Sequence, residues 1–451
     1  MAEGSPIEEI KDREIALFWF RRDLRLEDNT ALMAALSSGY PVLPIFIFDS
    51  HILDELPEDD PRVGFIYKHL QKIHHFLLGQ NSSLHISKGD PLKVWKSLLS
   101  SYQVKAVFVN KDYEPYARQR DREVHKLCQD RGIVFQQFKD QVIFEKSEIV
   151  KKDGSPYTVF TPYKNKWLEE FRLRASSILP GKDPGSVGKG EGSYFQNVKA
   201  FPSLESLGFI PSRVQVRPYD LSYLEQYAEL RNMPGADATS YLSPHLRFGT
   251  LSIRKLISTL GPVDEIFLSE LIWREFFMQI LFHFPRVIDQ SFKQKYQGIH
   301  WRNDPEDFEL WCQGLTGYPM VDAGMRQLNS SGYMHNRVRM VTASFLCKHL
   351  LIDWRWGEAY FARKLLDYEL SSNNGNWQWA AGTGCDAAPY FRVFNPMEQQ
   401  KKFDADLSYV KKWIPEFGTS EYPKPMIDHK FARERALSVY KEGLANYLPG
   451  L

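Results

Sequence analysis

The sequence contains few cysteines, and their spacing suits neither cross-linking nor metal binding. Cys128, Cys312, Cys347 and Cys385 lie far apart, and no CxxC pair occurs. Structural zinc sites and disulfide frameworks both need closely spaced cysteines, so the spacing argues against both. We therefore expect free thiols in a reducing compartment and no metal site.

Long apolar runs and dinucleotide-binding glycines are also missing. No segment approaches the roughly 18 consecutive apolar residues that a membrane-spanning helix needs. The first residues include Glu3, Glu8 and Glu9, whereas a secretion signal begins with basic residues followed by an apolar run. These absences predict a cytoplasmic protein with no membrane partner. No GxGxxG motif follows the first apolar run, which excludes the standard dinucleotide fingerprint there.

The composition is that of a globular protein with more than one domain. The chain has 451 residues, of which 43% are hydrophobic and 25% are charged, and at about 150 residues per domain this predicts two or three domains. Residues 1–60 contain 5 Lys/Arg and 14 Asp/Glu, whereas the remaining chain contains 52 Lys/Arg and 42 Asp/Glu. The basic excess fits a polyanion partner for the later part, but an ordinary solvated surface explains it as well.

The first third of the chain alternates between predicted strands and helices. Apolar runs predict strands at 15–20, 41–48, 83–87, 106–110 and 133–138. Helical patterns cover 29–36, 63–78, 91–99 and 117–131. This alternation predicts a doubly wound, Rossmann-like parallel sheet in an α/β domain over residues 1–138. Arg21, Asp49 and Asn110 each follow a strand, so their side chains should cluster beyond the carboxyl ends of the strands.

The rest of the chain is predicted to comprise a linker and a helical domain. Residues 139–215 contain a turn-rich stretch at 181–192 and are interpreted as an interdomain linker. Strand signals are scarce afterwards, which predicts an all-helical C-terminal domain over 216–451. Helices are predicted at 263–282, 324–329, 336–351, 358–370 and 429–447.

Hydroxyl side chains gather just before one of the helical segments. Thr239, Ser240 and Ser243 lie in the segment 238–249. The start of a helix presents unpaired N–H groups and a partial positive charge, which suits phosphate oxygens. The alternative is an ordinary helix cap, which has the same composition.

A second segment places a carboxylate beside an aromatic ring. Glu270, Trp273, Arg274 and Phe277 share one face if residues 269–277 are helical. A nucleobase pocket needs such a pair, since the ring stacks on the base while the acid binds its edge. The alternative is a surface ion pair between Glu270 and Arg274.

The third group spans residues 332–340 and 373–379. Asn336 and Met340 are one helical turn apart, Arg337 lies beside them, and Arg339 is expected to reach an acid such as Asp367. Eight of the 11 tryptophans lie at or after Trp273. Two of these, Trp377 and Trp379, fall in a Gly/Asn-rich stretch that we interpret as a loop. Packing in the core is the alternative role for these indoles.

These residues together resemble the photolyase/cryptochrome flavoproteins, and most closely the photolyases that repair cyclobutane pyrimidine dimers in DNA. The resemblance runs in order through nearly the whole chain. Its segments are residues 18–29, 239–249, 270–276, 316–323, 334–340, 351–354 and 373–396.

The resemblance implies that the helical domain binds FAD, which is active in its reduced form. The positions that match the family's phosphate-binding residues are Tyr227, Thr239, Ser240, Leu242 and Ser243. Those that match residues near the adenine and the lesion are Phe267, Glu270, Arg274 and Asn336. Those that match residues around the isoalloxazine are Arg339, Asp367, Glu369 and Asn373.

Two of these positions distinguish members of the family. The family usually has Asp where this chain has Glu369, which changes the geometry of a side-chain contact but not of a backbone contact. Asn373 matches the residue that faces flavin N5, where photolyases have an amide and plant-type cryptochromes have an acid. An amide supports an anionic reduced flavin without adding a second negative charge.

The resemblance also implies a lyase reaction on UV-damaged DNA, in which light-driven electron transfer from reduced FAD splits the dimer after it flips out of the duplex. The residues carried over as catalytic are Glu270, Trp273, Met340, Asn373 and Trp379. Asn336 would bridge flavin and lesion, and Arg231 and Arg337 would bind the flanking phosphates. Trp301, Trp354 and Trp377 match the family's chain of tryptophans that transfers electrons to the flavin.

Other functions stay open at this point. A cryptochrome-like blue-light photoreceptor would use the same FAD site, and a (6-4) photolyase would use two adjacent histidines where this chain has Met334-His335-Asn336. A nucleotide-binding domain fused to a nucleic-acid adaptor would need no flavin. We expect a monomer.

A second, light-harvesting chromophore is expected in the N-terminal domain, and folate, deazaflavin and FMN are the alternatives. Asn110, Asp112, Tyr113 and Glu114 lie at the appropriate strand end, although a solvated loop would have the same composition.

Overall fold

The computed structural model describes residues 13–180, 193–387 and 389–447, which form two compact units. The first unit comprises Met1–Glu145, Glu170–Arg217 and Ser243–Leu260. The second comprises Lys146–Glu169, Pro218–Leu242 and Gly261–Leu451. The acidic residues Glu3, Glu8 and Glu9 and the turn-rich stretch 181–192 lie outside the described residues. The expected domain limits at 138 and 216 stay predictions.

The first unit is built on a parallel sheet. Its strands are β1 (Glu14–Phe20), β2 (Val42–Asp49), β3 (His85–Gly89), β4 (Gln103–Asn110) and β5 (Val134–Phe138). These five strands are arranged in the order β3-β2-β1-β4-β5. Phe18 in the central strand lies opposite Pro44 of β2 and Phe108 of β4. The expected strands are all present, and their order confirms the Rossmann-like class.

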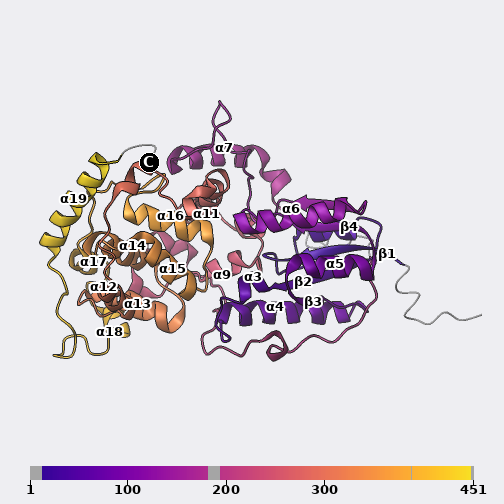
Figure 1. Cartoon of the computed structure of the whole chain (residues 1–451), viewed down its shortest axis with the longest axis horizontal. Coiled ribbons are helices and arrows are strands. Elements are labelled where there is room, and N and C mark those ends of the chain that lie inside the picture. The colour runs from indigo at the N-terminus through magenta and orange to yellow at the C-terminus, as the bar shows by residue number, and fades with distance from the viewer. Residues whose placement is uncertain (1–12, 181–192, 388, 448–451) are drawn as a thin grey trace, which may run out of the picture. The chain divides into compact units, whose positions relative to one another are not determined.

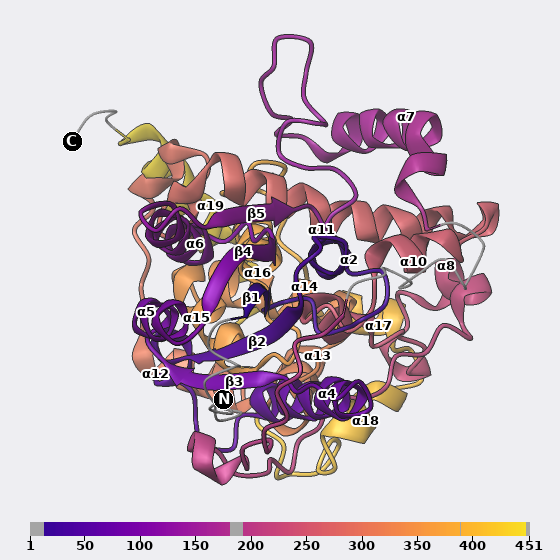
Figure 2. The ribbon, with the colours of Figure 1, turned by 90° about the vertical axis from the view of Figure 1, so that its right-hand side faces the viewer.

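Helices cover both faces of this sheet, as Figure 2 shows. They are α2 (Thr30–Leu36), α3 (Ser50–Leu53), α4 (Pro61–Leu78), α5 (Pro91–Ser101) and α6 (Pro115–Gln129). Side chains alternate between the two faces of a strand, so Phe18 and Phe20 pack with α2 and α4. Leu17 and Trp19 pack on the other face, with α5 and α6. Strands buried on both faces explain the uninterrupted apolar runs in the sequence.

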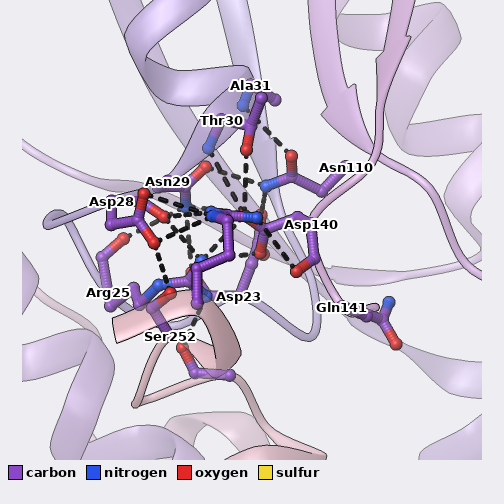
Figure 3. A network of polar contacts seen from close by, with 12 residues as sticks. Asp23, Arg25, Asp28, Asn29, Thr30, Ala31, Asn110, Asp140, Gln141 and Ser252 are labelled. Carbon is purple, nitrogen blue, oxygen red and sulfur yellow. Dashed lines mark hydrogen bonds and ion pairs between the residues drawn. The ribbon is translucent and has the colours of Figure 1, made fainter. Parts of the chain in front are cut away.

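Beyond the ends of β1 and β4 lies a buried network of ion pairs, drawn in Figure 3. The carboxylate of Asp140 is 1% exposed and accepts hydrogen bonds from Arg25 at 2.7 Å and from Arg254 at 2.8 Å. Arg254 lies on α10 (Ile253–Ser258) and also pairs with Asp28 at 3.0 Å. Burial opposes ionisation of Asp140, but the charges of Arg25 and Arg254 lower its pKa. The network therefore ties α10 to the end of β1.

The chain between the sheet and the helical core contains one long helix and several short ones. They are α7 (Phe160–Ile178), η1 (Glu205–Leu207), η2 (Leu224–Gln226), α8 (Tyr227–Leu230), η3 (Pro234–Ala236), α9 (Leu242–Arg247) and η4 (Pro262–Asp264). The division between the two units falls inside α7, after Glu169. The region interpreted as a linker thus contains a helix of 19 residues.

The described residues of the second unit form helices joined by loops, with no named β-strand. Its remaining helices are α11 (Glu265–His283), η5 (Pro285–Ile288), η6 (Gln294–Gly298), α12 (Pro305–Gln313), α13 (Pro319–Ser331), α14 (Asn336–Ser344), α15 (Trp354–Lys364), α16 (Leu370–Ala381), α17 (Pro396–Phe403), α18 (Ser408–Trp413) and α19 (His429–Ala445). A π-helix, η7 (Phe345–His349), continues α14 directly. The expected all-helical character is confirmed for this unit.

Helix α16 packs against α11, α14 and α15 (Figure 1). A Cβ atom at Gly375 of α16 would overlap Cδ1 and Cε1 of Phe277 on α11. A Cβ atom at Gly357 of α15 would overlap the ring of Trp377 on α16. The two glycines therefore allow aromatic rings to lie directly on helix backbones at both contacts.

Two local expectations were wrong. Trp377 and Trp379 lie in helix α16 rather than in a loop, and the helix expected at 358–370 is two helices, since α15 ends at Lys364 and α16 begins at Leu370. Glu369 caps α16 by accepting from the N–H groups of Ser371 and Ser372. Glycine and asparagine have low helix propensity, but this cap and the burial of α16 override it.

No helix among residues 13–180, 193–387 and 389–447 is long and apolar enough to cross a membrane. Within the same residues, no group of three or more His, Cys, Asp or Glu side chains is arranged to hold a metal ion. The four cysteines are free, and three of them are buried.

The packing of α16 on α11 predicts opposite outcomes for two Gly→Ala substitutions. Gly375→Ala should destabilise the protein by about 1–3 kcal/mol, because the new methyl group overlaps the Phe277 ring. Gly64→Ala in α4 meets no atom within 4 Å and should stabilise the protein by about 0.5–1 kcal/mol through helix propensity. Urea unfolding measures both, and equal effects at the two sites would contradict the packing argument.

Candidate active site

The carboxylate of Glu270 on α11 pairs with an arginine from a different part of the chain. Arg231, which follows α8, donates to Oε1 of Glu270 at 2.8 Å. The side chain of Glu270 is 33% exposed, and that of Arg231 is 24% exposed. The ion pair thus joins two predicted site residues, Glu270 for the lesion and Arg231 for a DNA phosphate. The partner of Glu270 is therefore Arg231 and not Arg274, which the sequence analysis had given as an alternative.

Trp273, one turn further along α11, is held by a ring that the sequence did not indicate. Phe160 of α7 stacks on it with ring centroids 3.6 Å apart and planes 9° apart. The N–H of Phe160 donates to Oδ2 of Asp386 at 3.0 Å, which fixes the start of α7. Phe277 lies 5.4 Å away from Trp273 at 30°. Trp273 is therefore a rigid aromatic surface rather than a free side chain.

The start of α14 carries three of the predicted site residues. His335 caps the helix by accepting from the N–H of Arg337 at 3.2 Å, and Asn336 is its first, exposed residue. The guanidinium of Arg337 donates to Oδ1 of Asn232 at 2.6 Å and lies 4.4 Å from the centre of the Phe403 ring. The sulfur of Met340 lies 3.7 Å from the same guanidinium.

Arg337 lies among other positive charges. Burial lowers the pKa of Arg337, and the charges of Arg231 and Arg392 lower it further. We call Arg231, Arg337 and Arg392 the arginine cluster. Glu270 already pairs with Arg231, but an added anion would offset the repulsion that Arg337 experiences, so the cluster is suited to phosphate groups.

The expected contact between Arg339 and Asp367 is confirmed. Arg339 donates to Oδ2 of Asp367 at 2.9 Å and to the carbonyl of Met334 at 2.8 Å. Oδ1 of Asp367 is buried and has no hydrogen-bond partner among the described residues. A buried acceptor without a donor costs about 1–3 kcal/mol, so this atom is suited to an N–H group of a ligand.

Helix α16 contributes Glu369, Asn373 and Trp379. The carboxylate of Glu369 is used as the helix cap and also accepts from the hydroxyl of Ser371 at 2.6 Å. The amide nitrogen of Asn373 donates to Oε1 of Glu358 at 2.8 Å and to the Glu358 carbonyl at 3.1 Å. Burial raises the pKa of Glu358, and the hydrogen bond from Asn373 opposes this. The orientation of the Asn373 amide is therefore set by α15. Trp379 is half-buried against the core.

Two of the three predicted electron-transfer tryptophans lie at α15. Trp354 begins this helix, is 1% exposed and has a buried Nε1 without a partner among the described residues. The ring of Trp377 lies over Gly357, one turn further along. Trp301 instead packs edge-on against Tyr440 of α19, with ring centroids 5.9 Å apart.

The predicted phosphate-binding residues lie on both sides of the start of α9. Thr239 and Ser240 precede the helix, Leu242 is its buried first residue, and Ser243 is exposed. Tyr227 packs edge-on against Phe267 with ring centroids 5.1 Å apart. Arg274 is half-exposed on α11.

In the first unit, the expected cluster beyond the strand ends is confirmed. Arg21 donates to the Asn110 carbonyl and pairs with Asp121, which also binds Arg120 at 3.0 Å. Arg120 in turn lies 3.7 Å from Asp49.

The candidate chromophore residues of the same region make internal contacts. The amide of Asn110 donates to Asp23 at 2.6 Å and to Asn29 at 2.8 Å. Asp112 and Glu114 pair with Arg22 at 3.3 and 2.9 Å. The hydroxyl of Tyr113 donates to Glu145 at 3.2 Å. These four side chains thus stabilise the loop after β4.

Several residues of the site were not indicated by the sequence. Phe160, Asn232 and Glu358 each contact a predicted residue from a distant part of the chain. Their residue types are common, and only their positions in the fold distinguish them. These three residues could have been identified from the sequence only if the packing of the helices had been known.

The arrangement joins an acidic side chain, fixed aromatic rings and the arginine cluster within the second unit. A carboxylate hydrogen-bonds polar groups, aromatic rings contact a base, and guanidinium groups bind the phosphates on either side of it. The buried acceptor at Asp367 and the oriented amide at Asn373 provide a separate polar region, suited to a heterocyclic cofactor.

Known proteins match the chain over most of its length. A profile described as DNA photolyase matches residues 16–182, and one described as the FAD binding domain of DNA photolyase matches residues 267–420. A deoxyribodipyrimidine photo-lyase of Vibrio cholerae is 36% identical over 94% of this chain and 99% of its own length.

Two solved structures have a similar fold. An archaeal photolyase from Sulfolobus tokodaii with two FAD molecules gives a TM-score of 0.80 at 34% identity, covering 95% of this chain and 100% of its own. A Synechocystis cryptochrome gives a TM-score of 0.83 at 26% identity, covering 94% of this chain and 99% of its own.

Proposed function

The chain belongs to the photolyase/cryptochrome family, and on this premise we propose how its residues repair cyclobutane pyrimidine dimers in DNA. Its activity is that of a deoxyribodipyrimidine photo-lyase, an FAD-dependent enzyme that opens the cyclobutane ring. The observation that carries the assignment of residues is the ion pair between Glu270 and Arg231, which joins the carboxylate to the arginine cluster.

The residues around Asp367 fit FAD. The unpartnered Oδ1 of Asp367 can accept from a ring N–H, and the guanidinium of Arg339 balances the charge of the same carboxylate. Asn373 brings a neutral amide, and Thr239, Ser240 and Ser243 bring hydroxyls for the phosphates. The Glu369 carboxylate is engaged by Ser371 and Ser372, so a contact from this residue to the cofactor would come from its backbone. When bound in its reduced form, FAD supplies the photoexcited electron that opens the ring.

The chain's own residues bind and orient the dimer. We assign Trp273, Trp379 and Met340 to contact the flipped-out bases, because flat or apolar side chains replace the stacking that the dimer loses. Glu270 accepts a hydrogen bond from a pyrimidine edge, and Asn336 lies between the lesion and the cofactor. Arg231 and Arg337 bind the flanking phosphates.

Trp301, Trp354 and Trp377 are proposed to pass electrons from the surface to the oxidised cofactor. Trp354 and Trp377 are buried, whereas Trp301 is half-exposed. An indole can be oxidised reversibly without any rearrangement of the surrounding core, so a series of them suits this task.

We further propose that the protein acts as a monomer in the cytoplasm.

A second chromophore is proposed for the first unit. Folate, deazaflavin and FMN all remain alternatives for this pigment. The internal contacts of Asn110, Asp112, Tyr113 and Glu114 favour other residues of the unit as its direct ligands.

A light-sensing role is the second candidate, because the fold also matches a cryptochrome. A (6-4) photolyase is less well supported by the geometry. His335 caps α14, and its burial and the nearby arginines lower its pKa to about 4, so at neutral pH it is an uncharged imidazole and not the imidazolium that would act as a strong acid toward a lesion.

A repair assay tests the proposal directly. Purified protein with chemically reduced FAD is mixed with an oligonucleotide that contains a thymine dimer, and half of the sample is kept in darkness. Intact thymines should return only in blue light. Photoreduction of the flavin without repair would instead favour the sensor.

Glu270→Ala should retain FAD but lower the repair yield per absorbed photon. A hydrogen bond to a charged group contributes about 1.5–3 kcal/mol, so we expect roughly a tenfold loss or more. The control is Glu265→Ala, which removes an exposed carboxylate from the first position of the same helix. Equal yields from the Glu270→Ala variant and the parent would contradict the assigned role.

Trp377→Phe should abolish light-driven reduction of the oxidised flavin, while repair by chemically reduced protein remains. The phenyl ring lacks the outer indole atoms that lie on Gly357, so we expect a cost in stability of about 1–3 kcal/mol from the space left behind. Trp356→Phe, on α15 and packed against Phe308, is the matched control. The measurement is the decay of oxidised-flavin absorption under blue light, and unchanged decay would exclude Trp377 from the chain of tryptophans.

A further inference from the structure

The first turns of helix α7 belong to the second unit, and their buried face packs on α11. Phe160, Tyr163 and Trp167 are the buried residues of α7, and their spacing places them on one face of the helix. The indole N–H of Trp167 donates to Oε1 of Glu275 on α11 at 2.7 Å, and the hydroxyl of Tyr163 donates to the same oxygen at 3.4 Å. Glu275 is 2% exposed. Because a buried carboxylate is stable only with such partners, these contacts fix α7 on α11.

The ring of Phe160 lies face to face with the indole of Trp273. The ring centroids are 3.6 Å apart, and the planes differ by 9°. Aromatic pairs on their own prefer an offset or edge-on arrangement with centroids about 4.5–7 Å apart. The N–H of Phe160 is bonded to Asp386, and its ring lies edge-on to Phe276 with centroids 5.8 Å apart. The surroundings of Phe160, rather than the preference of the pair itself, therefore set the stacked geometry.

The stacking fixes Trp273 but leaves part of its surface accessible. Phe160 is buried, whereas Trp273 is half-buried. A side chain that becomes ordered only when a ligand arrives loses conformational entropy at that moment, and this weakens binding. Because Phe160 already holds the indole, contact between Trp273 and a base does not include this cost.

In the proposed function, Trp273 contacts only one kind of DNA. It meets a base that has flipped out of the duplex, whereas the arginine cluster binds phosphates that every duplex carries. A residue that orients Trp273 should therefore affect the affinity for damaged DNA and leave the affinity for undamaged DNA unchanged.

We propose that Phe160 is a positioning residue for lesion recognition, which holds the Trp273 ring in the orientation that a flipped-out base contacts. Asp386 and Glu275 keep the start of α7, and with it Phe160, in place. Phe160 thereby contributes to discrimination between damaged and undamaged DNA without contacting the DNA itself. The inference rests on the proposed function, since it takes Trp273 as a contact of the lesion.

The test compares Phe160→Leu, Phe160→Tyr, Trp273→Ala and the double variant Phe160→Leu/Trp273→Ala with the parent, all as full chains with FAD bound. The probes are the same duplex with and without one thymine dimer, and affinity is measured in darkness across a range of salt concentrations. Phe308→Leu is the matched control, because Phe308 also stacks on a tryptophan, Trp311, with centroids 5.7 Å apart and planes 20° apart. It lies on α12, which carries none of the proposed site residues. Urea unfolding and flavin absorption are recorded for each variant.

Phe160→Leu should weaken binding to the damaged duplex on the order of fivefold, because the indole must then be ordered during binding. Binding to the undamaged duplex and the salt slopes should stay as in the parent, since no phosphate contact changes. Phe160→Tyr keeps the ring and should bind like the parent, as should Phe308→Leu. If Phe160 acts through Trp273, the double variant binds the damaged duplex no more weakly than Trp273→Ala alone.

Parental affinity of Phe160→Leu for the damaged duplex would overturn the proposal. An equal loss for both duplexes would indicate a general structural role and overturn it, as would equal losses in Phe160→Tyr and Phe160→Leu. Tighter binding would overturn it too, because the Phe160 ring would then occupy the place of the base. Losses that add in the double variant would exclude action through Trp273.

A second variant keeps the proposal testable if Phe160→Leu does not fold. Asp386→Ala removes the acceptor of the Phe160 N–H and must then weaken binding to the damaged duplex alone, and any other result overturns the proposal. Failure of the proposed function is recognised separately, as absence of light-dependent repair in the parent.

Discussion

The close approach of α16 to its neighbours is the constraint on which the rest of the helical unit depends. Gly375 lets the Phe277 ring lie on the backbone of α16, and Gly357 lets the Trp377 ring lie on that of α15. Ordinary side chains at these positions would push the helices apart. Glu270 and Trp273 on α11 and Asn373 and Trp379 on α16 would then lose their relative positions. The absence of side chains at Gly375 and Gly357 therefore determines where the site residues can lie.

The second physical theme is the gathering of positive charge. The charges of Arg231 and Arg392 both act on Arg337 and lower its pKa. Arg231 pairs with Glu270, and Arg337 donates to Asn232. Glu270 is proposed for the lesion and Arg231 for a flanking phosphate, so their ion pair links the two proposed contacts.

Much of the fold could be predicted from the sequence, because the first unit follows simple rules. Apolar runs gave the strands, and Asp60 and Asp90 before prolines mark the starts of α4 and α5. The contact between Arg339 and Asp367 was also predictable, since an arginine beside a helix start has few acids within reach. The helical conformation of Trp377 and Trp379 was not predictable, because a Gly/Asn-rich stretch has low helix propensity. The helix is explained only by the burial of α16 and by the Glu369 cap. Phe160 and Asn232 were missed for the same reason, since long-range packing brings them to the site.

The features that separate repair from light sensing lie both beside the flavin and on the DNA side of the site. Beside the flavin, the resemblance gives photolyases an amide, as in Asn373, and plant-type cryptochromes an acid. The chain of tryptophans serves both functions, so the remaining distinction lies on the DNA side. The like charges of the arginine cluster repel one another, and this repulsion is offset when a phosphate backbone binds. A sensor that does not bind DNA gains nothing from such a cluster. The helical unit is therefore suited to a polyanion, and its acid and aromatic rings are the proposed contacts for a base that the polyanion carries.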